Sequence, residues 1–105
     1  LGYTTWAPLI TTPPHPEYLA AHATLSSSAA VALESVFGSN YAFADHTYEA
    51  LGMGVRNFSS IEAAGTEAGL SRLFGGIHYR PSIEAGKLTG IKVGENVIAL
   101  LQTGN

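Results

Sequence analysis

Apolar residues recur at helical spacing in the first half of the chain. From about Ala20 to Phe37 the chain is rich in alanine, and its apolar side chains repeat every three or four residues. Gly38 follows and suits the C-terminal cap of a helix. The pattern therefore predicts a helix over about 20–37, with an apolar stripe formed by Leu25, Ala29, Ala32, Leu33, Val36 and Phe37.

A second helix is predicted from about Ser60 to Phe74. Ser59 and Glu62 have the spacing of a capping box, in which Ser59 is the N-cap and Glu62 occupies position N3. Gly65 and Gly69 give this helix a slim face that is suited to close packing.

A third helix is predicted to begin at Pro81-Ser82, with Ser82 as its N-cap, and to run to about Gln102. Its glycines recur every four residues, which predicts a close contact with another helix. A membrane-embedded contact of this kind is disfavoured because charged side chains interrupt the helix. The glycines are Gly86, Gly90 and Gly94, and the charged residues are Lys87, Lys92 and Glu95. The residues expected to provide apolar burial are Val93, Val97, Leu100 and Leu101.

The remaining segments lack helical periodicity. Several prolines favour an extended conformation over residues 1–19, where Trp6 either anchors the segment on the core or lines a pocket. Residues 39–58 are mixed in character and predict a loop with a short strand near Val55–Phe58. The predicted fold class is therefore all-α, a helical bundle fragment of about three main helices with one long loop.

Composition narrows the possible partners. The chain has 105 residues, a formal net charge of -3 and no basic run, so nucleic acid is not an expected partner. No apolar run reaches the roughly 18 residues that span a bilayer. The absence of cysteine excludes disulfides and thiolate metal sites. The chain begins at Leu1 without an initiator Met or a signal-peptide pattern, which we interpret as a piece of a longer protein.

The clearest chemical signal is an Arg and a His in the run Ser71-Arg72-Leu73-Phe74-Gly75-Gly76-Ile77-His78. Six residues make about 1.7 helical turns, so Arg72 and His78 do not share a helical face. A turn at Gly75-Gly76 would let both side chains reach one pocket. Arginine suits phosphate-like oxyanions, and histidine can be a nucleophile, a proton carrier or a metal ligand. The alternative is an Arg paired with a carboxylate and a His packed in the core.

The other histidines carry weaker signals. His22 is expected in the first helical turn, where free backbone N–H groups attract anions, although it could simply be exposed there. Asp45, His46 and Glu49 match no strong metal-ligand spacing. They and His15 are therefore interpreted as loop residues.

Two blocks of sequence have a characteristic separation. The first block is Leu19-Ala20-Ala21-His22. The second block follows after the 48 residues 23–70 and consists of Ser71-Arg72 and then His78. Together they resemble the acid phosphatase / vanadium-dependent haloperoxidase superfamily, whose pattern is Pro-Ser-Gly-His, then Ser-Arg, five residues, His, three residues and Asp. The Pro-Pro-His-Pro-Glu-Tyr lead-in and the run Gly-Gly-Ile-His-Tyr-Arg-Pro-Ser-Ile-Glu-Ala-Gly look like the bacterial haloperoxidase-like branch. The resemblance extends from about Trp6 to the end of the chain.

The resemblance implies a pocket of basic side chains and backbone N–H groups that holds phosphate or vanadate. His78 would attack phosphorus or ligate vanadium directly, and His22 would be the acid–base histidine. Arg72 would bind the oxyanion oxygens and neutralise developing charge. Ala20 and Ala21 stand in the places of the family's Ser and Gly, so a hydroxyl is lost while the N–H of Ala21 is kept.

The chain departs from the family pattern at two further points. Ser82 stands where the family usually has an Asp that orients the second His, and it brings no charge. Glu84 is a candidate substitute for that Asp. The family's earlier block, with a Lys and an Arg, has no counterpart here. The resemblance therefore makes residues 1–105 the C-terminal part of a helical domain whose site an upstream segment of the same protein completes.

The implied activity is that of a vanadium-dependent haloperoxidase, which binds vanadate and oxidises halide with hydrogen peroxide. One alternative is a phosphatase that hydrolyses phosphomonoesters through a histidine nucleophile, with no vanadate cofactor. A second is a non-catalytic helical module with a degenerate site, which Ala20 and Ser82 favour. Small molecules and the upstream segment are the expected partners, and relatives suggest a periplasmic or secreted location.

Overall fold

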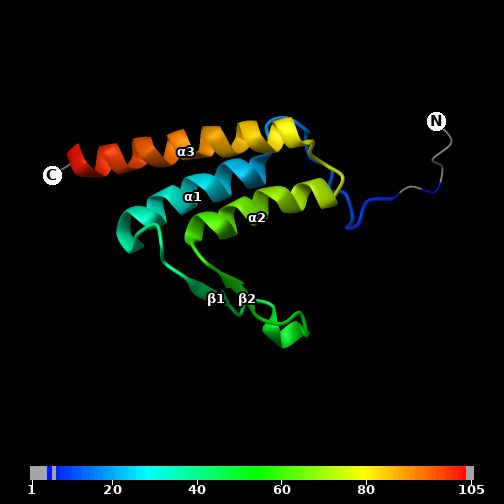
Figure 1. The fold of residues 1–105 in the computed structure, drawn as a ribbon. Coiled ribbons are helices and arrows are strands. Elements are labelled where there is room, and N and C mark those ends of the chain that lie inside the picture. Colours follow the sequence, from blue (N-terminus) through cyan, green and yellow to red (C-terminus); the bar gives the residue numbers. More distant parts are fainter. Residues whose placement is uncertain (1–4, 6, 104–105) are drawn as a thin grey trace.

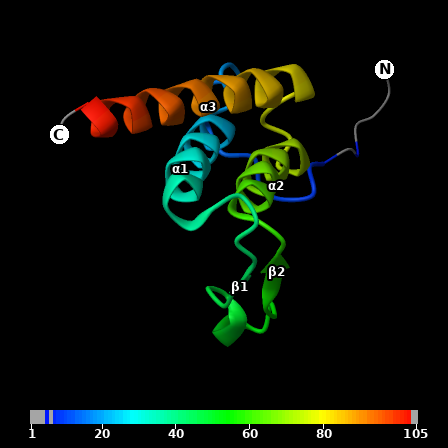
Figure 2. The same cartoon turned by 60° about the vertical axis from the view of Figure 1, so that its left-hand side comes forward.

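Three helices carry the fold: α1 (Ala21–Phe37), α2 (Ile61–Phe74) and α3 (Arg80–Thr103). The computed structural model describes residue 5 and residues 7–103. α1 packs against both other helices, whereas α2 and α3 contact each other less extensively. Figures 1 and 2 show α3 running along one side of the α1–α2 pair. The predicted helical bundle of three main helices is confirmed.

Glycines set the short distance between α1 and α3. A Cβ atom on Gly90 would lie 2.2 Å from the backbone oxygen of Thr24, and one on Gly94 would lie 2.7 Å from Cβ of Val31. Real side chains do not approach so closely, so a larger residue would push the helices apart. The predicted close packing of the glycine face of α3 is therefore confirmed.

The slim face predicted for α2 also packs on α1. Gly65 and Gly69 are both buried, and a Cβ atom on Gly69 would lie 3.1 Å from Cβ of Ala23. The buried residues of α1 itself are Ala23, Ser27 and Ala30. The buried residues of the three helices are therefore small ones: alanines and a serine in α1, glycines in α2, and glycines and a serine in α3.

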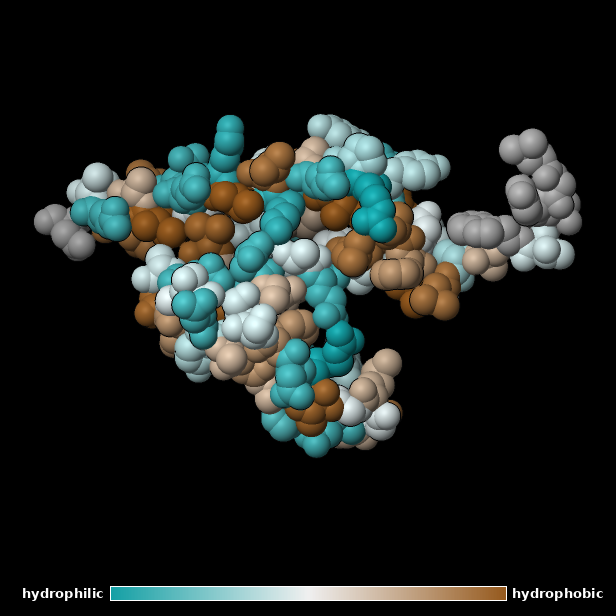
Figure 3. Space-filling view, viewed as in Figure 1, coloured by the Kyte–Doolittle hydropathy of each residue, from teal (hydrophilic) through white to brown (hydrophobic). Residues whose placement is uncertain are grey.

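The predicted burial of the larger apolar residues is wrong for this chain. Leu25 is 69% exposed and Val36 is 76% exposed, because α2 and α3 approach α1 on its small-residue face instead. Leu33, Phe37, Val93, Val97, Leu100 and Leu101 are exposed as well. Figure 3 shows apolar side chains at the surface along α3. Both helices thus present apolar surface that the described part of the chain does not cover.

Two of the predicted N-cap residues are wrong. Ser60, not Ser59, is the N-cap of α2, and its hydroxyl accepts the N–H of Ala63 at 3.0 Å. α3 begins at Arg80, so Ser82 lies inside its first turn and is not its N-cap. Proline is tolerated in that first turn because the N–H it lacks would have no partner within the helix.

The C-terminal cap predicted for the first helix is confirmed. α1 ends at Phe37, and Gly38 has a φ of 91° that a residue with a Cβ atom rarely adopts. Its N–H donates to the carbonyl of Glu34 at 2.8 Å.

A β-hairpin projects from the helices between α1 and α2 (Figures 1 and 2). β1 (Phe43–Asp45) pairs antiparallel with β2 (Arg56–Phe58), and the short 3-10 helix η1 (Glu49–Leu51) lies between them. Phe43 faces Phe58, and the centroids of their rings are 5.4 Å apart. The strand predicted near Val55–Phe58 is confirmed, but its partner strand was not predicted.

The segment before α1 has no helix over its described residues, in agreement with the prediction from its prolines. The N–H of Leu9 donates to the carbonyl of Phe74 at 3.1 Å, and the hydroxyl of Thr12 donates to the carbonyl of Gly75 at 2.7 Å. These bonds bring the segment to the C-terminal end of α2. Trp6 lies outside the described residues. Among the described helices, none is long and apolar enough to cross a membrane.

Candidate active site

The turn between α2 and α3 links Arg72 to His78. The carbonyl of Arg72 accepts the N–H groups of Ile77 and His78 at 3.3 and 3.4 Å. Gly76 within the turn has a φ of 66°, in the left-handed region that glycine adopts without strain. The backbone therefore folds back on the last turn of α2 and brings His78 close to Arg72, as the Gly75-Gly76 pair predicted.

His78 is buried, with 4% of its surface exposed. Its Nδ1 atom is hydrogen-bonded to the backbone carbonyl of Glu17. The same carbonyl accepts the hydroxyl of Ser82 at 2.7 Å, and the carboxylate of Glu17 accepts the N–H of Tyr79 at 2.9 Å. Three polar contacts with Glu17 thus attach the start of α3 to the segment that precedes α1.

His22 lies in the first turn of α1, as predicted, on a largely exposed position. Partial burial lowers the pKa of His22 below its ordinary value of 6.5, and the charges of Arg72, His15 and His78 lower it further. Charges act in this way only at short range. The three residues of the two sequence blocks, His22, Arg72 and His78, are therefore electrostatic neighbours.

Arg72 has an unsatisfied polar atom. Its Nε is buried and has no hydrogen-bond partner in the part of the chain that the structure describes. A buried donor without a partner costs stability, and such atoms often mark a site for a ligand or an ion. An oxyanion is the ligand class that guanidinium donors bind best.

Ala20 and Ala21 lie at the beginning of α1. Ala20 occupies the N-cap position with its side chain fully buried, and it makes no side-chain cap hydrogen bond. Ala21 is the first helical residue, so its N–H belongs to the group that has no partner within the helix. The oxyanion-binding roles that the resemblance implied for Ala20 and Ala21 stay predictions.

Ser82 and Glu84 differ from their expected places around His78. Ser82, which is 2% exposed, donates to the Glu17 carbonyl, and this carbonyl is also the partner of His78 Nδ1. Glu84 lines a separate cavity between the helices. At Nδ1, a backbone carbonyl therefore occupies the place expected for an acidic or hydroxyl side chain.

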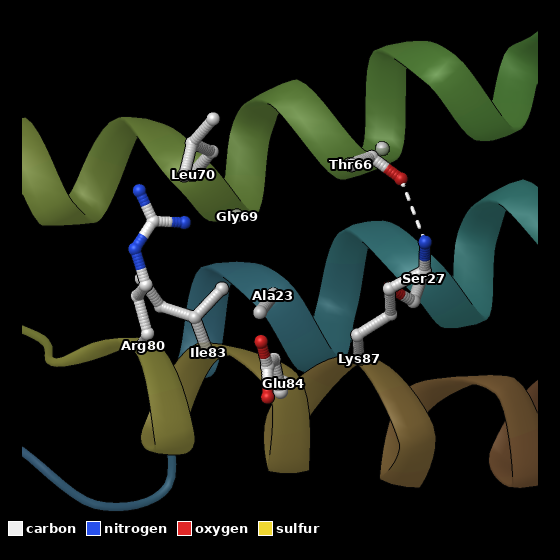
Figure 4. A pocket seen from close by; sticks show the side chains of 10 residues that line it. Ala23, Ser27, Thr66, Gly69, Leu70, Arg80, Ile83, Glu84 and Lys87 are labelled. Atoms are coloured by element: carbon white, nitrogen blue, oxygen red, sulfur yellow. Dashed lines mark hydrogen bonds between the residues drawn. The ribbon is translucent and has the colours of Figure 1, made fainter.

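That separate cavity has a volume of about 270 Å³ and lies between α1, α2 and α3 (Figure 4). Its lining includes Ala23, Gly69, Ile83 and Glu84 but not His22, Arg72 or His78. Lys87 at its edge donates to Thr66 at 3.0 Å and to Glu62 at 2.8 Å. The candidate site is therefore distinct from this cavity.

The hairpin region has no metal-binding geometry among the described residues. The Oδ1 atom of Asp45 accepts the N–H of Thr47 at 2.9 Å, and Nδ1 of His46 bonds to Glu49 at 2.7 Å. These contacts satisfy the side chains locally. Of these three residues, which were interpreted as loop residues, Asp45 ends β1, Glu49 begins η1, and His46 lies between the two elements.

Sequence reasoning missed two contributors to the site. Glu17 acts chiefly through its backbone carbonyl, which every residue has, so no residue type could reveal it. His15 was interpreted as a loop residue, yet its charge affects the pKa of His22. Both residues lie in the proline-rich lead-in, where the sequence predicted an extended segment and a family resemblance but no site residue.

Comparison with known proteins identifies the class to which this arrangement belongs. Residues 2–104 match the family model described as "VCPO second helical-bundle domain". A solved structure described as that of the first bacterial vanadium-dependent iodoperoxidase is 43% identical, with a TM-score of 0.85. No match was found among curated proteins. The chain therefore has a vanadium haloperoxidase-like fold.

Within that class, the chain belongs to the VCPO second helical-bundle domain family. The match to the iodoperoxidase structure covers 90% of this chain and 23% of the other chain. The chain thus corresponds to less than a quarter of the length of that relative.

Proposed function

We propose that this chain supplies His22, Arg72 and His78 to the oxyanion site of a vanadium-dependent haloperoxidase that oxidises halide with hydrogen peroxide. The observation that carries the proposal is the buried Nε of Arg72 without a partner, beside a buried His78 and an electrostatically coupled His22. The similarity to an iodoperoxidase makes iodide the first halide to test.

Each residue has a role that follows from its chemistry. Arg72 binds oxyanion oxygens through donors that need no reorganisation. His78 presents its remaining ring nitrogen, Nε2, as the ligand or nucleophile because Nδ1 is already bonded to Glu17. His22, whose lowered pKa leaves it neutral near pH 7, accepts a proton from the incoming peroxide. The N–H of Ala21 adds a backbone donor at the end of α1.

The donor set suits vanadate. A buried guanidinium N–H without a partner and a neutral imidazole nitrogen are the kinds of group that hold an oxyanion and its central atom. Vanadate, when bound, supplies the Lewis-acidic centre that activates peroxide toward halide. Arg72 would hold its oxygens and His78 its metal. A Lys and an Arg from an upstream segment of the same protein would complete the charge.

The test compares His78→Ala with the parent in the full-length protein. Oxidation of iodide by peroxide, followed by halogenation of a dye, is measured with and without vanadate, beside a phosphomonoester assay. We expect vanadate-dependent halogenation in the parent and its loss in His78→Ala, because His78 alone forms the bond to vanadium. His46→Ala is the matched control, since His46 lies in the hairpin and should leave activity unchanged.

Three results would contradict the proposal. Full activity in His78→Ala would place the chemistry elsewhere. Phosphomonoester hydrolysis without halogenation would indicate the phosphatase. A folded protein with neither activity would indicate the non-catalytic module, which the buried methyl group of Ala20 favours because the family's hydroxyl is missing there.

A further inference from the structure

Glu17 contacts the site histidine and two residues that follow it in the chain. Its carbonyl accepts from Nδ1 of His78 and from the hydroxyl of Ser82, and its carboxylate accepts the N–H of Tyr79. His78 and Ser82 are both buried. One residue from the lead-in segment therefore fixes the position of the histidine and of the helix start that follows it.

The nature of the partner determines where the proton of His78 lies. A carbonyl oxygen can only accept, so Nδ1 of a neutral His78 must carry the hydrogen. Nε2 then has the lone pair. A carbonyl has two acceptor positions, so the hydroxyl of Ser82 can donate to it without displacing the imidazole.

The carboxylate adds a second restraint. The N–H of Tyr79 precedes α3 and has no partner within that helix, and Glu17 Oε1 accepts it at 2.9 Å. The carbonyl and the carboxylate thus bind adjacent residues, 78 and 79. This fixes the rotation of the Glu17 peptide group, and with it the direction of the carbonyl.

We propose that Glu17 is the positioning residue of His78. The backbone carbonyl of Glu17, in place of a side-chain acid, selects the Nδ1–H tautomer of the His78 ring. The proposal deepens the proposed function, since that tautomer leaves Nε2 free to bind vanadate. Ser82 stabilises the carbonyl and does not itself orient the imidazole.

The test weakens this carbonyl without changing a side chain. Replacing Tyr18 by the corresponding α-hydroxy acid converts the Glu17 carbonyl into an ester carbonyl, a weaker acceptor. Tyr41, exposed in the loop before β1, receives the same α-hydroxy acid as the matched control. The tautomer of His78 is read by NMR of ring-nitrogen-labelled histidine in the full-length, vanadate-free protein, with His78→Gln assigning the signal.

We expect the Nδ1–H form of His78 to predominate in the parent and in the Tyr41 ester, and to lose population in the Tyr18 ester. Vanadate affinity should fall roughly 10–100-fold in the Tyr18 ester, the usual effect of removing a partner of a metal-bound histidine. Glu17→Ala should reduce affinity in the same direction, while Glu17→Gln, which keeps an acceptor for Tyr79, should stay close to the parent.

Three outcomes would overturn the proposal. The first is a predominant Nε2–H form in the parent. The second is a Tyr18 ester with the parent's tautomer and affinity. The third is a tautomer change in Ser82→Ala but not in the Tyr18 ester, which would make Ser82 the orienting group. Because the tautomer is measured without vanadate or halide, this result is independent of whether the protein is a haloperoxidase.

Discussion

At the scale of residues, the candidate site combines the permanent positive charge of Arg72 with two histidines. Arg72 lies close enough to His22 to lower its pKa, and burial lowers that pKa more strongly. Protonating His22 is therefore less favourable in the folded chain than in the unfolded one. As the pH falls through the ordinary histidine value of 6.5, the unfolded state takes the proton first, and His22 progressively destabilises the fold.

Replacing Arg72 with Gln should raise the pKa of His22 while leaving it below 6.5, because burial, the larger cause, remains. NMR titration of the His22 ring measures this pKa. Arg80→Gln is the control, since Arg80 is exposed in the first turn of α3 and is not among the causes of the shift. Equal shifts in both variants would show that Arg72 has no specific effect on His22.

At the scale of elements, contact between α1 and α3 depends on glycine. The glycine face of α3 meets backbone oxygens and small side chains of α1, at distances that exclude a Cβ atom. Glycine is a poor helix former, with a cost of roughly 0.8–1.0 kcal/mol relative to alanine. Close packing against α1 explains why glycine is repeated within α3, because this packing outweighs the low helix propensity of glycine.

Gly90→Ala should lower the free energy of unfolding by about 1–3 kcal/mol, since the added methyl group would meet the backbone oxygen of Thr24 at 2.2 Å. Urea denaturation measures the change. Gly65→Ala in α2 is the control, because its Cβ would meet Ser26 at 3.1 Å and should change stability by less than about 1 kcal/mol. Stabilisation by Gly90→Ala would mean that the two helices can move apart without cost.

At the scale of the whole molecule, large apolar side chains of α1 and α3 are exposed. Leu25 and Val36 on α1 and Leu88 and Leu100 on α3 are each exposed. Large exposed apolar patches usually mark contacts with further protein. The match to the iodoperoxidase structure covers 23% of that chain.

We expect the 105-residue chain to bind vanadate or phosphate weakly, and a longer protein with the upstream segment to bind tightly. In the proposed site, this chain supplies one permanent cation, Arg72, to an anion with more than one charge. Loss of one preorganised donor has cost roughly 2.7–4 kcal/mol in a known enzyme, so two missing cations should cost several orders of magnitude. Calorimetric titration of both proteins with phosphate and vanadate provides the comparison. Equal affinity would mean that the chain holds the complete site.

Local patterns in the sequence were sufficient for the helices and for the turn between Arg72 and His78. Helical spacing of apolar residues, a glycine cap and a four-residue glycine repeat depend on neighbours along the chain, so they predicted α1, α2, α3 and the close packing of α3. The spacing between Arg72 and His78, with two glycines between them, likewise predicted a turn that brings them together.

The tertiary structure alone decided which helix faces are buried and what holds His78. An amphipathic pattern identifies an apolar face but not its partner, and Leu25 and Val36 are exposed because the small-residue face of α1 receives both neighbours. A backbone carbonyl is chemically the same at every position, so the contact of Glu17 with His78, 61 residues away, had no sequence signal. Such a contact exists only once the chain has folded and placed that carbonyl beside the ring.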